Sequence, residues 1–332
     1  MKPAVDVDRA DLAVGVDFGG TKMLGVAVDR DGAIIAEHRV PTPYDEVGLL
    51  DSLAGIVRTL QDAAGGTVAG LGVGAAGLVD RAGTLQYGPN VGGVTNVGIR
   101  TAMEERLPGQ VVRVDNDANA ATWAECLLGA GRRRREMVLV TLGTGIGGGL
   151  VTGGKLFRGQ NGYGAEFGHM TVDAKGVQCI CGLNGCWEAY ASGRALGRMG
   201  RKAAEAGTLD KAVELAGGQI ENIRGEHVTH AARLGASGAL AVMDDFAWWV
   251  ACGVASIISI ADPELVVLGG GLAEENALFL PAAQRHLQDL TFGVRNRPAV
   301  PLVVATLGER AGAVGAAMLV HGDEMPEIQS VT

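Results

Sequence analysis

Cysteine and histidine side chains gather in one short, glycine-containing stretch of the chain. The four residues concerned are His169, Cys179, Cys181 and Cys186. Three thiolates and one imidazole complete the tetrahedral ligand set of a structural zinc ion. Gly182 and Gly185 allow the sharp turns that bring sulfur atoms toward one point. We therefore expect a zinc site in the segment 164–188, here called the cysteine loop. The alternative is three loosely buried thiols beside an unrelated histidine.

A second group of polar residues follows the apolar run 111–114. The stretch 115–119 reads Asp-Asn-Asp-Ala-Asn and opens a helical pattern. Polar side chains at the carboxyl end of a strand are typical of ligand sites in open α/β sheets. The dipole of the following helix favours an ionised Asp117, which could accept a proton from a hydroxyl group. Helix capping by Asp or Asn is the simpler interpretation, but one such residue would suffice for it.

Glycine-rich loops follow apolar runs at three places. The first joins two strand-like runs, the second repeats this arrangement about 125 residues later, and the third follows the run 265–268. The loop residues are Asp17, Gly19, Gly20, Thr21 and Lys22, then Gly143, Thr144 and Gly145, and finally Gly269, Gly270 and Gly271. Exposed backbone N–H groups and threonine hydroxyls can cradle phosphate. Each loop alone could be an ordinary hairpin, but the repeated order of strand, loop and strand predicts a duplicated α/β fold.

Composition and charge exclude several classes of protein. The chain has 332 residues, 47% hydrophobic and 20% charged, which is enough for two domains with a sizeable core. The net charge of −9 argues against nucleic acid as a partner. The N-terminal residues carry no signal-peptide pattern, and the apolar run 246–261 is too short for a comfortable membrane span. We expect a cytoplasmic protein with no membrane association.

Helical patterns separate the strand-like runs and suggest how they are connected. We expect helices near 51–64, 101–107 and 187–202, and one or two long apolar helices over 231–260. A final helix of small residues near 311–320 is suited to packing closely on a sheet.

Six motifs occur in an order that resembles the ROK family, which comprises repressors, open-reading-frame proteins and sugar kinases. They are DFGGTK at 17–22, DNDANAA at 115–121, LGTGIGGG at 142–149, GAEFGHM at 164–170, CICGLNGCWE at 179–188 and VVLGGG at 266–271. The resemblance extends over nearly the whole chain and is strongest to the family's bacterial ATP-dependent glucokinases. It implies an actin-like, duplicated ribonuclease-H-like fold of two α/β domains with a cleft between them.

The resemblance also implies domain limits, an activity and cofactors. The smaller domain would span 1–120, completed by the C-terminal helix 311–322, and the larger would span 121–310 with a zinc-binding loop at 164–188. The implied reaction is transfer of the γ-phosphoryl group of ATP to the 6-hydroxyl of glucose. Mg²⁺ and a structural Zn²⁺ are the implied metals. A homodimer or a homotetramer is the implied assembly.

The family's site residues can be placed on this chain motif by motif. Asp117 matches the catalytic base. The sugar contacts would be Asn90, Asn116, Asp117, Glu166, His169 and Glu188. The nucleotide contacts would be Asp17, Gly19, Gly20, Thr21, Lys22, Thr144, Gly145, Gly269, Gly270 and Gly271. The zinc ligands would be His169, Cys179, Cys181 and Cys186.

Other functions remain possible at this point. The nearest alternative is a kinase for N-acetylmannosamine, N-acetylglucosamine, mannose or fructose, and polyphosphate could replace ATP as the donor. A sugar-sensing regulator is less consistent with the sequence, because the first strand begins near Leu12 and leaves little room for a DNA-binding module. A zinc-stabilised module without turnover is disfavoured by Asp117 beside Asn116.

Overall fold

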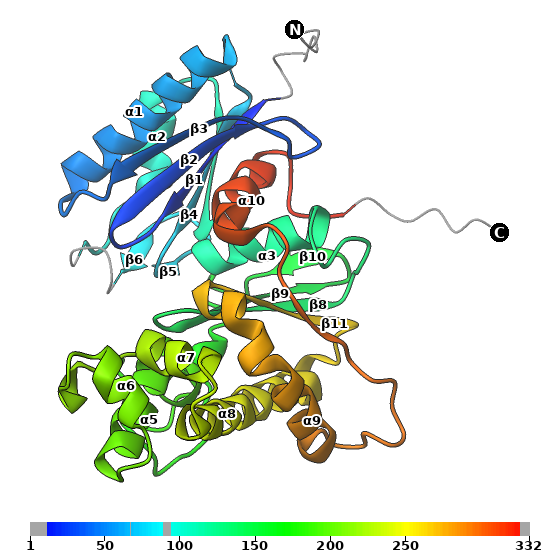
Figure 1. The fold of residues 1–332 in the computed structure, drawn as a ribbon. Coiled ribbons are helices and arrows are strands. Elements are labelled where there is room, and N and C mark those ends of the chain that lie inside the picture. Colours follow the sequence, from blue (N-terminus) through cyan, green and yellow to red (C-terminus); the bar gives the residue numbers. More distant parts are fainter. Residues whose placement is uncertain (1–11, 67, 89–93, 326–332) are drawn as a thin grey trace, which may run out of the picture. The chain divides into compact units, whose positions relative to one another are not determined.

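The computed structural model describes residues 12–66, 68–88 and 94–325 and divides the chain into two compact units (Figure 1). The first comprises Met1–Leu139, Gly149–Ala165 and Thr306–Thr332, and the second comprises Val140–Gly148 and Glu166–Ala305. The segment from Thr306 on therefore belongs to the first unit. The first unit also contains the segments 121–139 and 149–165, which the sequence analysis placed in the larger domain.

The first unit is built on a five-stranded sheet with the strand order β3-β2-β1-β4-β7. The strands are β1 (Ala13–Phe18), β2 (Lys22–Val28), β3 (Ile34–Pro41), β4 (Gly70–Ala75) and β7 (Val111–Asn116). The hairpin β1–β2–β3 is antiparallel, whereas β4 and β7 are added in parallel. A small separate hairpin is formed by β5 (Leu78–Val79) and β6 (Leu85–Tyr87).

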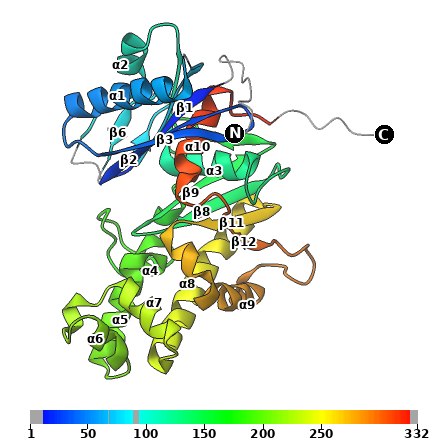
Figure 2. The same ribbon diagram turned by 45° about the horizontal axis from the view of Figure 1, so that its top comes forward.

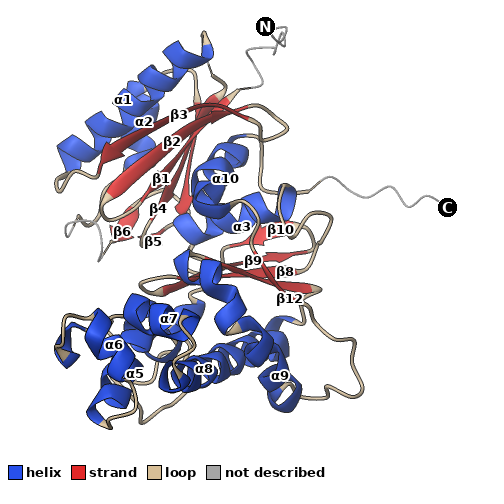
Figure 3. Cartoon of the chain, in the orientation of Figure 1, coloured by secondary structure: helices blue, strands red, loops and turns tan. Residues whose placement is uncertain are grey.

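Helices cover both faces of this first sheet (Figure 3). They are α1 (Glu46–Ala64), α2 (Ile99–Arg106), α3 (Asp117–Leu127) and α10 (Ala311–Val320). Helix α1 packs on the face of Gly25, where an added Cβ would lie 2.3 Å from the Ile56 side chain. Helix α10 packs on the opposite face, that of Gly15 and Gly72. A Cβ on Gly72 would lie only 1.7 Å from the Ala316 carbonyl oxygen, so this close helix–sheet contact requires glycine.

The second sheet repeats the topology of the first. Its strands are β8 (Met137–Leu142), β9 (Ile146–Thr152), β10 (Lys155–Phe157), β11 (Leu265–Gly269) and β12 (Leu302–Val304). Their order, β10-β9-β8-β11-β12, is again third, second, first, fourth and fifth in the chain. β9 and β10 are antiparallel and β11 and β12 are parallel, as in the first sheet. The predicted duplication is therefore confirmed.

Most helices of the second unit follow the cysteine loop in the chain (Figure 2). They are α4 (Glu188–Ala191), α5 (Gly193–Glu205), α6 (Asp210–Leu215), α7 (Gly225–Arg233), α8 (Ser237–Ala261) and α9 (Leu280–Leu290). The helix expected over 187–202 is in fact two helices, because Ser192 is extended and caps α5 through a bond from the Ala195 N–H. Helix α8 has the length and composition of a membrane span, but 61% of its most apolar window is buried inside the protein.

Candidate active site

The carboxyl ends of three parallel strands bring the candidate residues of the first unit to one sheet edge. In the register of β1, β4 and β7, Phe18 lies opposite Ala75, and Ala75 lies opposite Asn116. Asp17 and Asp117 are next to these positions, and the charge of Asp117 helps to raise the pKa of Asp17. The edge predicted to carry the chemistry therefore carries two acidic side chains.

Asn116 and Asp117 form the turn that starts helix α3. The Asn116 Oδ1 accepts hydrogen bonds from the N–H groups of Ala118 and Asn119 at 2.9 and 3.1 Å, which makes it the N-cap. Its Nδ2 donates to the Gly77 carbonyl oxygen at 3.0 Å. Both sides of the Asn116 amide thus hold the backbone of the turn, and one N–H of Nδ2 remains for a ligand.

Asp117 is the first residue of α3 and is partly buried. Burial raises the pKa of its carboxyl group, and the hydrogen bond from the Ala118 N–H only partly opposes this effect. The sequence analysis expected the helix dipole to favour ionisation, but the loss of hydration is the larger effect. A carboxylate whose pKa is closer to neutrality is also a stronger base toward a hydroxyl proton.

Asp17 shows the same effect. Burial and the nearby Asp117 raise its pKa from 3.8 to about 7, while Lys22 acts in the opposite direction. Two neighbouring carboxyl groups with raised pKa values form a site where a divalent cation would be stabilised, since oxygen ligands and negative charge suit Mg²⁺.

The first glycine loop connects β1 directly to β2 without an intervening helix, as predicted. The Gly19 N–H donates to the Lys22 carbonyl oxygen, and the Thr42 hydroxyl donates to the Gly19 carbonyl oxygen at 2.7 Å. Thr21 is exposed, and the exposed Lys22 ammonium pairs with Glu309 at 3.2 Å. These bonds fix the backbone of the loop at Gly19, while the side chains of Thr21 and Lys22 stay exposed to solvent.

The second loop, Gly143–Gly145, lies in the second unit against the third glycine loop. Gly270 has a left-handed φ of 81°, and a Cβ there would lie 2.5 Å from the Leu142 carbonyl oxygen, at the end of β8. The Gly143 carbonyl oxygen accepts a bond from the Gly193 N–H at the start of α5. The structure therefore brings together Thr144, Gly145 and the loop Gly269–Gly271, all predicted nucleotide contacts.

Glu188 ties the second loop to the cysteine loop. Its Oε2 accepts a hydrogen bond from the Ile146 N–H at 2.9 Å, and its Oε1 lies 3.9 Å from the Cys179 sulfur. A Cβ on Gly145 would lie 2.3 Å from Oε2, so this approach requires glycine. A carboxylate predicted only as a sugar contact therefore also fixes the backbone after Gly145.

The predicted zinc ligands converge. The ligand atoms of His169, Cys179, Cys181 and Cys186 all lie within 4.8 Å of one another. The Cys181 and Cys186 sulfur atoms are 3.6 Å apart. Two thiolates bound to one tetrahedral zinc at about 2.3 Å each would be about 3.8 Å apart. The separation of the Cys181 and Cys186 sulfur atoms is thus close to that of a tetrahedral site.

The backbone of the cysteine loop explains this convergence. Gly182 and Gly185 have φ values of 91° and 76°, in the left-handed region, so the turns predicted at these glycines are present. Behind the loop, the buried Trp187 donates from Nε1 to the Trp249 carbonyl oxygen of α8 at 2.7 Å. Among the described residues, His169 Nδ1 is buried without a hydrogen-bond partner. A buried, unpaired ring nitrogen on a histidine that lies close to three thiols fits a metal ligand.

One predicted site residue is not described by the structure, and one ion pair near the site was not predicted. Asn90 lies outside the described residues. The ion pair between Arg158 Nε and Asp115 Oδ2, at 2.5 Å, was not predicted; it lies directly before the turn formed by Asn116 and Asp117. Asp115 was visible within the quoted motif, but its partner is 43 residues away and carries no local signal.

Comparisons with known proteins agree with this arrangement. The ROK family model matches residues 13–323. The chain is 39% identical to a glucokinase of Streptomyces coelicolor, over 93% of this chain and 97% of that protein. It is 36% identical to a glucokinase of Thermotoga maritima, over 92% and 96%.

Solved structures extend this likeness to three dimensions. The crystal structure of a ROK family glucokinase from Streptomyces griseus, in complex with glucose and AMPPNP, superposes with a TM-score of 0.80 at 38% identity. The match covers 93% of this chain and 98% of that one. The fold is the actin-like, two-domain α/β fold of this family, and the chain belongs to the ROK family.

Proposed function

We propose that this protein is an ATP-dependent glucokinase, which converts glucose and ATP to glucose 6-phosphate and ADP. The observation that carries the proposal is the partly buried Asp117, with its raised pKa, at the carboxyl edge of the first sheet, in a chain that matches glucokinases over most of its length. The Streptomyces griseus relative was crystallised with a sugar and an ATP analogue, the two ligands that the reaction requires.

Asp117 acts as the general base in this reaction. Its carboxylate accepts the proton of the sugar 6-hydroxyl as that oxygen attacks the γ-phosphorus of ATP. The bond from the γ-phosphorus to the bridging oxygen breaks, and ADP leaves. Asn116 holds the turn, and with it the Asp117 backbone, through its caps on Ala118 and Asn119. Phosphoryl transfer depends mainly on such positioning and on charge neutralisation.

Mg²⁺, when bound, neutralises charge on the phosphates. Asp17 is the residue that we place nearest to it, because a cation would relieve the unfavourable ionisation of the Asp17–Asp117 pair. The nucleotide phosphates would contact Gly19, Gly20, Thr21 and Lys22 on one loop and Thr144 and Gly145 on the other. The adenosine would lie toward Gly269, Gly270 and Gly271.

The sugar would be held by polar side chains from several segments. These are Asn90, Asn116, Asp117, Glu166, His169 and Glu188. Glu166 and His169 lie at the two ends of one short 3₁₀ turn (Phe167–His169), and Glu188 begins α4. The cysteine loop therefore places three of these side chains, which links sugar binding to the order of the loop.

We assign a structural zinc ion to the cysteine loop. Its support is the donor set, the 3.6 Å sulfur separation and the unpaired His169 Nδ1. Four protein ligands leave no open position for catalysis, so the ion would stabilise the loop that carries Glu166 and Glu188. Elemental analysis of the purified protein should find one zinc per chain, and a chain that purifies active without metal would contradict the assignment.

The assembly and the compartment are also proposals. A homodimer or a homotetramer is expected, and light scattering after gel filtration would distinguish these from a monomer. We place the activity in the cytoplasm, where glucose and ATP are available and reduced thiols can bind zinc.

A substrate panel tests the proposed function. Purified protein is assayed with Mg²⁺ and either ATP or polyphosphate, on glucose, mannose, fructose, N-acetylglucosamine and N-acetylmannosamine. We expect the highest kcat/KM with glucose and ATP. A higher value with an N-acetylated hexosamine would assign the protein to another hexose kinase of the family. No turnover with any sugar would favour a regulator or a structural module.

A further inference from the structure

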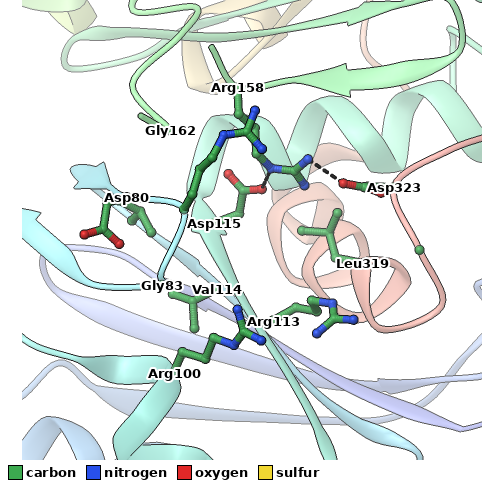
Figure 4. Close-up of a pocket in the computed structure, with 13 residues that line it drawn as sticks. Asp80, Gly83, Arg100, Arg113, Val114, Asp115, Arg158, Gly162, Leu319 and Asp323 are labelled. Atoms are coloured by element: carbon green, nitrogen blue, oxygen red, sulfur yellow. Dashed lines mark hydrogen bonds and ion pairs between the residues drawn. The ribbon is translucent and has the colours of Figure 1, made fainter. Parts of the chain in front are cut away.

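A cavity of about 300 Å³ lies within the first unit, beside strand β7 (Figure 4). This strand leads to the turn formed by Asn116 and Asp117, here called the catalytic turn. Its polar lining combines cations and carboxylates from five separate segments of the chain. The cations are Arg81, Arg100, Arg113 and Arg158, and the carboxylates are Asp80, Asp115 and Asp323. Four guanidinium groups around one cavity are unusual in a chain with a net charge of −9.

Two of the carboxylates are already satisfied by neighbouring groups. Asp80 Oδ1 accepts bonds from the N–H groups of Ala82 and Thr84, and its Oδ2 accepts one from the Gln86 side chain. Asp115 accepts from the Asn116 N–H, the Asn119 amide and Arg158 Nε. These two carboxylates therefore have little capacity left to neutralise the remaining arginines.

The arginines Arg100 and Arg113 are less fully engaged. Among the described residues, Arg113 donates from Nη1 to the Val112 carbonyl oxygen at 3.3 Å, and Arg100 donates from Nε to Glu104 at 3.0 Å. A guanidinium has five N–H donors, so both keep donors for a ligand. Their mutual repulsion across one cavity would be relieved by an anion.

The third carboxylate of the lining, Asp323, pairs with one of the arginines. Asp323 Oδ2 accepts a hydrogen bond from Arg158 Nη1 at 2.6 Å. The Arg158 side chain is 17% exposed, whereas the Asp323 side chain is 54% exposed. An ion pair with an exposed carboxylate is weak, so Asp323 is easily displaced. It occupies the position on Arg158 that an external anion would take.

We propose that this cavity binds a small phosphate-bearing anion, through Arg113, Arg100 and the outer nitrogens of Arg158. A phosphate dianion carries several acceptor oxygens and suits the forked geometry of arginine better than a single carboxylate does. The volume is at the lower limit of ligand pockets, which favours inorganic phosphate or a small phosphate monoester over a polymer.

An occupant would act close to the catalytic turn. Arg158 binds both Asp323 and Asp115, and Asp115 Oδ1 accepts the Asn116 N–H at 2.8 Å. Exchange of Asp323 for a phosphate dianion changes the negative charge beside the Arg158 guanidinium, which also holds Asp115. An effect on turnover rests on the proposed function, whereas binding itself does not.

Calorimetric titration of the full chain with sodium phosphate, at constant ionic strength and without nucleotide, tests the proposal. Arg113→Ala should weaken phosphate binding about tenfold, since it removes charge-assisted hydrogen bonds. Asp323→Asn should strengthen binding several-fold, because it removes the competing charge. Arg295→Ala, an exposed arginine of the second unit, is the matched control and should leave the affinity within about twofold.

A second titration uses glucose 6-phosphate to separate the phosphate group from its organic part. A gain over inorganic phosphate that is lost in Arg113→Ala would assign a sugar phosphate to the cavity. An equal affinity lost in the same variant would assign the phosphate group alone. Phosphate binding that is unchanged in Arg113→Ala would place it elsewhere and overturn the proposal. Absence of binding in both the unaltered protein and Asp323→Asn would overturn it as well.

Discussion

Replacing Asp17 by asparagine should stabilise the ligand-free protein at neutral and alkaline pH. The folded protein keeps a proton on Asp17 up to about pH 7, while the unfolded chain releases it near the ordinary pKa of 3.8. Folded molecules therefore bind more protons between these values, and the free energy of unfolding falls as the pH rises through this window. The change in pKa corresponds to about 4 kcal/mol at about 1.4 kcal/mol per pKa unit. Because Asp17 keeps some exposed surface, this value is an upper limit.

Urea unfolding of the ligand-free protein at about pH 4 and about pH 8 measures this effect. Asp17→Asn should match the unaltered protein at the lower pH and exceed it by about 2–4 kcal/mol at the higher pH. Asp62→Asn, which removes an exposed carboxylate on α1, is the control and should show no such pH dependence. Equal stabilities of Asp17→Asn and the unaltered protein at the higher pH would refute the reasoning. The same variant should also lose most turnover, because the carboxylate beside Mg²⁺ is gone.

Four further substitutions test packing and the loops. Gly72→Ala should destabilise the protein by about 2 kcal/mol or more in urea unfolding, because the new methyl group would lie 1.7 Å from the Ala316 carbonyl oxygen. Gly55→Ala, whose methyl group would meet nothing within 4 Å, should instead stabilise helix α1 by up to about 1 kcal/mol. Gly145→Ala should raise the KM for ATP, since the new Cβ would lie 2.3 Å from the Glu188 carboxylate and displace it. An unchanged KM for ATP would remove this loop from the nucleotide site. Cys181→Ala should abolish zinc retention and weaken glucose binding in calorimetry, and normal glucose affinity without zinc would contradict a stabilising role for the ion.

Local patterns in the sequence were sufficient to predict the hairpins and the cluster of cysteine and histidine side chains. Glycine and threonine between two apolar runs, with no helical pattern after them, predict strand, loop and strand, and β1–β2 confirms it. Cysteine and histidine carry their chemistry in the residue type, so His169 and Cys179 could be identified before their spacing was known.

Long-range effects could not be predicted in the same way. The raised pKa of Asp17 depends on burial by strands and helices from distant parts of the chain, together with the charge of Asp117. The pair of Arg158 with Asp323 joins residues that are 165 positions apart. The start of α1 was placed five residues too late, because the N-cap Asp45 lies in a polar stretch that shows no apolar periodicity.

The most direct test of the central claim is the kinetics of Asp117→Asn with glucose and ATP, paired with calorimetric titration of glucose. Asparagine preserves the shape of the side chain but cannot accept the hydroxyl proton. We expect kcat to fall by about 10²–10⁴-fold, as is typical for loss of a positioned base. Glucose affinity should change far less, because the Asn116 caps that hold the turn remain. Near-normal turnover in this variant would contradict the account.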